Sequence, residues 1–245
     1  MGQQTTKQDI ISELRKNMLA WEGFKPPVAG KADSIGLGPI EAAFPNRVFP
    51  TGTIHEFISE LPEHAAASDG FITGVLKSLM LKGGACLWIG TSRLVFPPAL
   101  KTFGIDPDRI VFIDLNREKD ILWVMEEALK CEGLAAVIAE MKQISFAESR
   151  RLQLATEKSR VTGFVIRTDP GKLSSTTCTA RWKITPIPSN LEDESIPGVG
   201  YPRWNVELLK VRNGNPGIWQ MEWSGKFIPL TKQTSTIHVT TLKAG

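Results

Sequence analysis

The sequence is poor in the residues that build metal centres and disulfide frameworks. Three cysteines and three histidines occur among its 245 residues. The cysteines, Cys86, Cys131 and Cys178, are far apart, odd in number and form no C-x-x-C pair, which excludes a disulfide framework. The histidines show neither H-x-x-x-H nor H-E-x-x-H spacing, so we expect no metal site and no cofactor. Reduced, buried thiols are the expected state of the cysteines.

Long apolar runs are also missing. No stretch approaches the roughly 20 apolar residues that a membrane-spanning helix needs, and the first ten residues, MGQQTTKQDI, lack the apolar core of a signal peptide. No G-x-S-x-G elbow occurs, which leaves nucleophilic hydrolysis unsupported. With 42% hydrophobic and 22% charged residues, the chain has the composition of an ordinary globular protein. We expect a cytoplasmic protein without membrane contact.

A large excess of one charge is absent as well. The formal net charge is +3, and the residues from Pro170 onward carry nine Lys/Arg against five Asp/Glu. This mild basicity does not by itself indicate a nucleic-acid-binding protein, since a solvated basic surface explains it equally.

The rest of the chain is organised around residues 51–90. An alternating strand at 53–58 is followed by a connection at 59–69, a helix predicted from 70 to about 81, and an apolar strand at 85–89. Strand, loop, helix and strand in this order form the βαβ unit that opens a P-loop fold.

The connection lacks the chemistry of a phosphate loop. A P-loop reads G-x-x-x-x-G-K-[ST], and its backbone N–H groups and one lysine hold phosphates. Here no glycine precedes Gly70 and no lysine precedes Lys77, whereas Glu60, Glu63 and Asp69 contribute carboxylates. A triphosphate would meet like charge, so we expect the scaffold without its nucleotide chemistry, with a degenerate site at these positions.

Downstream, apolar strands alternate with helices of ten to fifteen residues, which predicts an α/β fold with a mostly parallel sheet flanked by helices. From Thr177 the pattern changes to period two and predicts antiparallel strands added at the C-terminal side of the sheet. We expect four parts: an N-terminal helix (1–22), a Pro/Gly-rich linker (23–50), the core (51–225) and a flexible tail (226–245).

The N-terminal helix is amphipathic. Ile10, Ile11, Leu14 and Met18 follow helical spacing. The helix either packs on its own core or serves as an arm for partner binding or self-association, because the linker would detach it from the core.

Glu140 is a candidate for magnesium chemistry. It ends an apolar strand at 134–139, where open α/β sheets place ligand-facing residues and P-loop ATPases hold Mg²⁺. The alternative is a strand-end acid that is exposed or bonded to a neighbouring loop. Asp114 has the same two interpretations.

Basic residues alternate with tryptophans along the late strands. Such a pattern can bind single-stranded DNA by charge and stacking. The candidates are Arg181, Lys183, Arg203, Lys210 and Arg212. Period two places Trp182 and Trp204 on the opposite face, which favours the core for the tryptophans and a solvated face for the basic residues.

Several segments resemble the ImuA family, which is RecA-like, is associated with error-prone (translesion) DNA repair and has distant similarity to the cell-division inhibitor SulA. The similar segments are TGTIHEF, GGACLWIGTSRLVFPPALKTFGIDPDRIVFI, WVMEEALKCEGLAAVIAEM and TARWKITPIPS…PGVGYPRWNVELLKVRNG. They cover roughly residues 45 to 225. The most specific pieces are FGIDPDRI and PRWNVELLKVRNG.

The resemblance implies a RecA-type core acting in the SOS response beside a Y-family-like polymerase homologue and an error-prone replicative polymerase subunit, with RecA as a further candidate partner. It places Glu140 at the magnesium-binding acid and residues 60–69 at the phosphate loop. The water-activating acid would fall near residues 90–92, where no acid occurs. We therefore expect a non-catalytic accessory protein that acts through protein contacts. The alternatives are a divergent DNA-dependent ATPase and a SulA-like division inhibitor.

Overall fold

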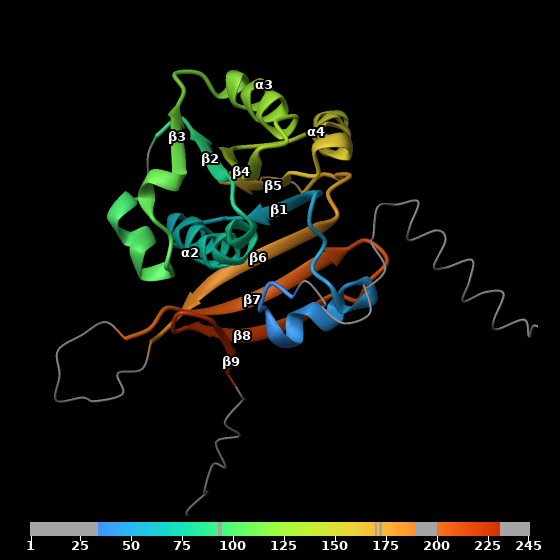
Figure 1. The fold of residues 1–245 in the computed structure, drawn as a ribbon. Coiled ribbons are helices and arrows are strands. Elements are labelled where there is room, and N and C mark those ends of the chain that lie inside the picture. The colour runs from blue at the N-terminus through green and yellow to red at the C-terminus, as the bar shows by residue number, and fades with distance from the viewer. Residues whose placement is uncertain (1–33, 93–94, 170, 172, 190–199, 231–245) are drawn as a thin grey trace, which may run out of the picture.

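The computed structural model describes residues 34–92, 95–169, 171, 173–189 and 200–230, which form one mixed nine-stranded sheet with helices on both faces (Figure 1). The strand order is β3-β2-β4-β5-β1-β6-β7-β8-β9. The first six strands of this order, β3, β2, β4, β5, β1 and β6, run parallel to their neighbours. Strands β7, β8 and β9 follow, and each pairs antiparallel with the strand before it. The predicted fold class, a mostly parallel sheet extended by antiparallel C-terminal strands, is confirmed.

The strands have these bounds: β1 Ile54–Ile58, β2 Ala85–Gly90, β3 Ile110–Asp114, β4 Leu134–Met141, β5 Thr162–Arg167, β6 Ala180–Ile187, β7 Arg203–Val211, β8 Gly217–Trp223 and β9 Phe227–Pro229. The α-helices are α2 Pro62–Leu79, α3 Glu118–Leu129 and α4 Phe146–Ser159. Short 3-10 helices are η1 Gly38–Ala43, η2 Pro45–Arg47, η3 Met80–Lys82, η4 Pro97–Phe103 and η5 Pro107–Arg109. None of these helices is long and apolar enough to cross a lipid bilayer.

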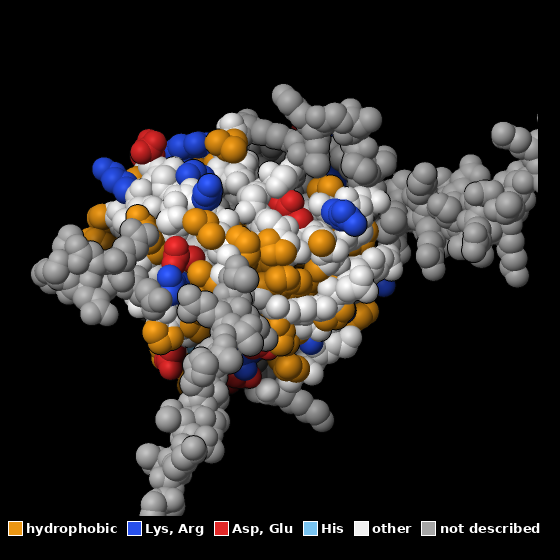
Figure 2. Space-filling view, turned by 90° about the horizontal axis from the view of Figure 1, so that it is seen from below, with side chains coloured by type: hydrophobic (Ala, Val, Ile, Leu, Met, Phe, Trp, Pro, Cys, Tyr) orange, Lys and Arg blue, Asp and Glu red, His pale blue; other side chains and the backbone are white. Residues whose placement is uncertain are grey.

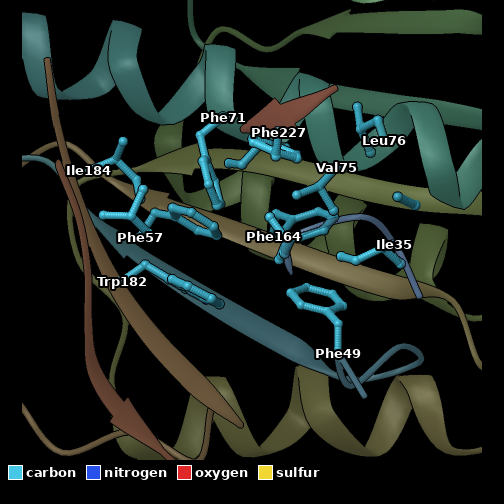
Figure 3. Packing of buried hydrophobic residues seen from close by; sticks show 14 of the residues in the cluster. Ile35, Phe49, Phe57, Phe71, Val75, Leu76, Phe164, Trp182, Ile184 and Phe227 are labelled. Carbon is cyan, nitrogen blue, oxygen red and sulfur yellow. The ribbon is translucent and has the colours of Figure 1, made fainter. Parts of the chain in front are cut away.

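The two faces of the sheet carry separate apolar cores. Helix α2 covers one face, and helices α3 and α4 cover the other (Figure 1). The α2 core is rich in aromatic rings, several of which lie together in Figure 3. Trp182 of β6 is fully buried there, with its ring stacked at 5.9 Å from that of Phe57. Full burial of one large apolar side chain stabilises a fold by about 1.5–3 kcal/mol.

The period-two pattern of the late strands is confirmed in this core. Trp182 and Trp204 are both buried against α2, while Arg181 and Lys183 project from the other face of β6, as alternation along a strand requires. The two tryptophans are therefore core residues.

The segment before β1 packs on the core, which corrects the predicted linker for residues 34–50. Leu37, Ile40 and Phe49 are buried in the α2 core. Phe49 stacks on the ring of His55 at 4.4 Å, and His55 Nε2 donates a hydrogen bond to the Pro50 carbonyl oxygen at 2.8 Å. The prolines and glycines suggested an extended chain, but the apolar residues between them bury the segment. Residues 23–33 lie outside the described ranges.

The C-terminal end is also more ordered than predicted. Residues Phe227–Pro229 form β9, and the Phe227 side chain is buried between Phe71 and Trp223, with ring centroids at 5.1 and 4.9 Å. The tail predicted to start at residue 226 is thus part of the sheet as far as β9, and residues 231–245 lie outside the description. Seen from below, Figure 2 shows hydrophobic side chains gathered across the middle of the face, with most charged side chains around them.

Candidate functional site

The connection between β1 and α2 has three residues, Ser59 to Leu61. Strand β1 ends at Ile58, and α2 begins at Pro62. The predicted loop through Asp69 and the predicted helix start at Gly70 are wrong. Proline is favoured in the first turn of a helix because its φ is already helical and it lacks the N–H that would stay unbonded there. Three alanines then follow, and alanine has the highest helix propensity.

The early helix start occupies the place of a phosphate loop. Such a loop needs several free backbone N–H groups that point toward one anion. Here Pro62 has no N–H, and the N–H groups of His64 and Ala65 both donate to the Leu61 carbonyl oxygen, at 3.0 and 3.2 Å. This backbone offers few of the donors that a β- or γ-phosphate requires.

The acids predicted for the degenerate site are separated by the helix. Glu60 lies in the connection and forms an ion pair with Lys183 Nζ at 2.7 Å, and this hydrogen bond holds the pKa of Glu60 below its usual value. Glu63 is exposed in the first turn of α2. Asp69 lies farther along the same helix. The structure therefore does not bring the three carboxylates into one loop.

Gly70 has a packing role. A Cβ atom added at Gly70 would lie 3.2 Å from Cζ2 of Trp204, and one added at Gly74 would lie 2.7 Å from Cζ of Phe227. These distances are shorter than ordinary van der Waals contact, so the two glycines allow aromatic rings of β7 and β9 to approach α2. The sequence signal was the spacing of four in Gly70-Phe71-Ile72-Thr73-Gly74, which places both glycines on one helix face.

Glu140 and Asp69 are two acids that interact electrostatically. Glu140 Oε1 accepts a hydrogen bond from Trp88 Nε1 at 2.6 Å, and burial raises the pKa of Glu140. Burial, together with the neighbouring Glu140, raises the pKa of Asp69 well above its usual value. Asp69 Oδ1 is enclosed and has no hydrogen-bond partner among the described residues. Both acids were predicted as site residues from the sequence, but their interaction was missed because the helix was predicted to start at Gly70.

A pocket of about 280 Å³ lies against this part of α2. Its walls come from α2, from the segment around η4, and from the start of β7. The lining residues are Ala66, Asp69, Gly70, Thr73, Val95, Ala99, Leu100, Phe103, Pro202 and Trp204. Among the described residues that line it, Asp69 is the one ionisable side chain, so the pocket combines apolar walls with a carboxyl group.

A second carboxylate, Glu56 of β1, is fully paired. It is completely buried and accepts from Arg167 Nη1, Arg181 Nε and Thr176 Oγ1, each at 2.8 Å. Two guanidinium groups and a hydroxyl supply the hydrogen bonds that a buried carboxylate needs. This cluster was missed in the sequence, where an acid between apolar residues of a buried strand was the available signal.

The five basic residues predicted for DNA contact all have acceptors within the chain. Arg181 pairs with Glu56, Lys183 with Glu60, and Arg203 Nε with Glu222 at 2.6 Å. Lys210 Nζ donates to the Thr176 carbonyl oxygen at 2.8 Å, and Arg212 Nη2 donates to that of Thr177 at 2.6 Å. These contacts tie the strip to its own sheet, and DNA binding by it stays a prediction.

The remaining predictions concern metal binding, the cysteines and the N-terminal helix. The described residues contain no group of three or more His, Cys, Asp or Glu that could hold a metal ion. Cys86 and Cys178 are buried, but Cys131 is exposed, so the expectation of buried thiols is wrong for Cys131. The predicted docking residues of the N-terminal helix, Ile10, Ile11, Leu14 and Met18, lie outside the described ranges.

Solved structures similar to this one belong to the RecA-like class. The RadB recombinase superposes with a TM-score of 0.51 at 14% identity, over 74% of this chain and 91% of that one. A KaiC-like protein from the archaeon Pyrococcus horikoshii OT3 gives a TM-score of 0.53 at 11% identity, over 82% of this chain and 99% of that one. At these identities the likeness establishes the fold alone, and it confirms a RecA/KaiC-like fold.

Sequence relatives identify the family. No protein-family profile matches the chain. The protein ImuA of Caulobacter vibrioides, from strains NA1000 / CB15N and ATCC 19089 / CIP 103742 / CB 15, is 34% identical over 201 residues, which cover 77% of this chain and 82% of the relative. With this identity over most of both chains, and with the RecA-like sheet that carries it, the chain belongs to the ImuA family.

Proposed function

We propose that the protein is a non-catalytic accessory factor in SOS-induced error-prone (translesion) DNA repair, and that it acts through contacts with other proteins. The role in repair follows from the association of the ImuA family with translesion synthesis. The proposed partners are a Y-family-like polymerase homologue, an error-prone replicative polymerase subunit and RecA.

The observation that carries the non-catalytic part of this proposal is the three-residue connection between β1 and α2. Helix α2 begins at Pro62, where an ATPase of this fold needs an open loop with free N–H groups and a lysine. Two further features support the proposal. Asp69 brings a second carboxyl group toward Glu140, and Gly90, at the expected position of the water-activating acid, ends β2 without a side chain.

Partner binding is tested by deleting residues 1–22 and measuring co-purification of the two polymerase proteins. We expect the deletion to abolish co-purification while thermal unfolding of the core stays unchanged. A matched control deletes residues 231–245, which follow the last described strand, and should retain the partners. A complex that survives loss of residues 1–22 would rule out the N-terminal helix as the docking arm.

The competing function is a divergent DNA-dependent ATPase, because Glu140 does stand near the carboxyl end of β4. Its test is hydrolysis of ATP with Mg²⁺ and single-stranded DNA by the wild type and by Glu140→Gln. We expect no DNA-stimulated hydrolysis in either protein. Robust hydrolysis that disappears in Glu140→Gln would establish the enzyme and refute the accessory role as stated.

A further inference from the structure

The 280 Å³ pocket beside α2 has an unusual combination of walls. Val95, Leu100, Phe103 and Trp204 provide apolar and aromatic surface, and no Lys, Arg or His of the described part of the chain lines the pocket. Ligand pockets for drug-sized molecules start at about 300 Å³, so this one is of a size for a single long side chain.

Asp69 makes the pocket chemically specific. Its Oδ1 is enclosed and has no hydrogen-bond donor among the described residues. Glu140 of β4, whose charge contributes to the raised pKa of Asp69, takes its hydrogen bond from Trp88 instead. A carboxyl group without a donor lowers protein stability. Asp69 is only partly buried and lines the pocket, so a group that brings positive charge and N–H donors can approach the carboxyl group from the pocket and offset this cost.

The carboxyl group of Asp69 and the apolar walls together favour one kind of ligand for this pocket. A guanidinium or ammonium group can donate to Asp69, while its aliphatic stem covers the apolar walls. Phe103 and Trp204 line the pocket, and a guanidinium group packs favourably against aromatic rings. Arginine is among the residues most enriched at the energetic centres of protein interfaces.

We propose that this pocket receives an arginine or lysine side chain of a partner protein, with the cationic group at Asp69 and the stem between Phe103 and Trp204. The assignment of the cation to a partner protein rests on the proposed accessory function. The preference of the pocket for an organic cation rests on its geometry alone, so the two parts are tested separately.

The first experiment titrates the protein with Nα-acetyl-arginine amide and with its uncharged isostere Nα-acetyl-citrulline amide. Binding is followed by the ¹⁵N-indole NMR signal of Trp204, assigned by its loss in Trp204→Phe. We expect the arginine amide to bind with a dissociation constant in the low millimolar range, about −4 kcal/mol or weaker, and the citrulline amide at least tenfold more weakly. Equal binding of both compounds, or no binding of the arginine amide, would overturn the proposal.

Variants locate the binding. Asp69→Asn removes the charge, and Ala99→Leu narrows the pocket from its exposed rim without touching Asp69; each should weaken binding at least tenfold. Glu63→Gln, which changes an exposed acid of the same helix outside the pocket, is the matched control and should bind as the wild type does. Retained tryptophan NMR spectra show that the variants are folded. Wild-type affinity in Asp69→Asn would contradict the proposed contact.

Two further measurements separate the sources of the cation. Agmatine carries the same guanidinium without the peptide groups, so binding of agmatine but not of the arginine amide would mean a free amine ligand and would refute the partner side chain. Co-purification of the polymerase proteins should weaken in Asp69→Asn but not in Glu63→Gln. Unchanged co-purification in Asp69→Asn would also refute binding of a partner side chain. If neither the wild type nor Glu63→Gln co-purifies with the polymerase proteins, the accessory function itself is refuted.

Discussion

Two acids on opposite sides of the sheet differ in their hydrogen-bond partners: Glu56 is buried on β1, and Asp69 is partly buried on α2. Glu56 faces away from α2 and is surrounded by Arg167, Arg181 and Thr176. Asp69, on α2, has an enclosed oxygen without a donor in the described part of the chain and a second acid beside it. The first arrangement stabilises the junction of β1, β5 and β6. In the second, no described residue donates to the enclosed oxygen, which is why we propose that a cation from outside the chain binds there.

The difference also distinguishes an acid that stabilises the fold from an acid that is available to a ligand. Removing an acid that is fully paired inside the chain should damage folding, because its partners stay charged. Removing an acid that is kept for a ligand should leave the fold intact or improve it, and should affect binding instead. The following predictions test this contrast, starting with the largest effect.

Glu56→Gln should lower the free energy of unfolding by about 3–5 kcal/mol, because the buried Arg167 and the partly buried Arg181 lose their counter-ion. Urea denaturation measures the change. The control is Glu127→Gln, which breaks an ion pair with Lys130 in which both side chains are about half exposed, and should cost less than about 1 kcal/mol. Similar small losses in both variants would mean that the Glu56 cluster does not stabilise the junction.

Acid should destabilise the protein through His55, because the buried imidazole forms its hydrogen bonds with the uncharged groups of Pro50 and Trp182. Burial lowers the pKa of His55 from 6.5 to about 4, and its Nδ1 accepts from Trp182 Nε1 at 3.3 Å. The unfolded chain therefore takes up a proton before the folded one does. The contribution of His55 is complete above pH 6.5 and is lost as the pH falls toward 4, by about 3 kcal/mol.

The measurement is the free energy of unfolding between pH 7.5 and 4 for the wild type and for His55→Gln. The variant should be less stable at neutral pH and should show a shallower loss in acid. Parallel curves for the two proteins would show that His55 is not the group responsible.

Trp88→Phe should destabilise the protein by about 2 kcal/mol, since the carboxylate of Glu140 loses its hydrogen bond from Trp88 in a partly buried position. The loss should be smaller at a pH low enough to protonate Glu140. Thermal unfolding at two pH values provides the comparison, and a pH-independent loss would point to lost packing of the indole rather than to the hydrogen bond.

Asp69→Asn should stabilise the free protein by about 1 kcal/mol at neutral pH, in the direction opposite to Glu56→Gln. Because the folded-state pKa of Asp69 is raised, the folded form keeps its proton longer than the unfolded chain. Its stability contribution is therefore complete below the unfolded pKa of about 3.9 and declines as the pH rises toward the folded pKa. The advantage of Asp69→Asn should vanish in acid, and a destabilised variant at neutral pH would contradict the contrast.

The sequence predicted the sheet well because its signals are local. Apolar runs and period-two alternation located the strands and placed Trp182 and Trp204 in the core. The helix start at Pro62 was missed because acidic residues suggested a loop, although a proline followed by alanines favours a helix start. The pairing of Glu56 with Arg167 joins residues 111 positions apart, and in the segment 34–50 Phe44 and Phe49 are buried against the distant Trp182. No local pattern encodes such contacts.

The central claim is that the phosphate site of this RecA-like scaffold is lost. Calorimetric titration of ATP into the full chain with Mg²⁺, in the presence and absence of single-stranded DNA, tests it most directly. We predict no binding at millimolar ATP in either condition, with a P-loop ATPase as positive control. Binding in the micromolar range would contradict the account, because it would require a phosphate site around residues 59–70 despite the helix that begins at Pro62.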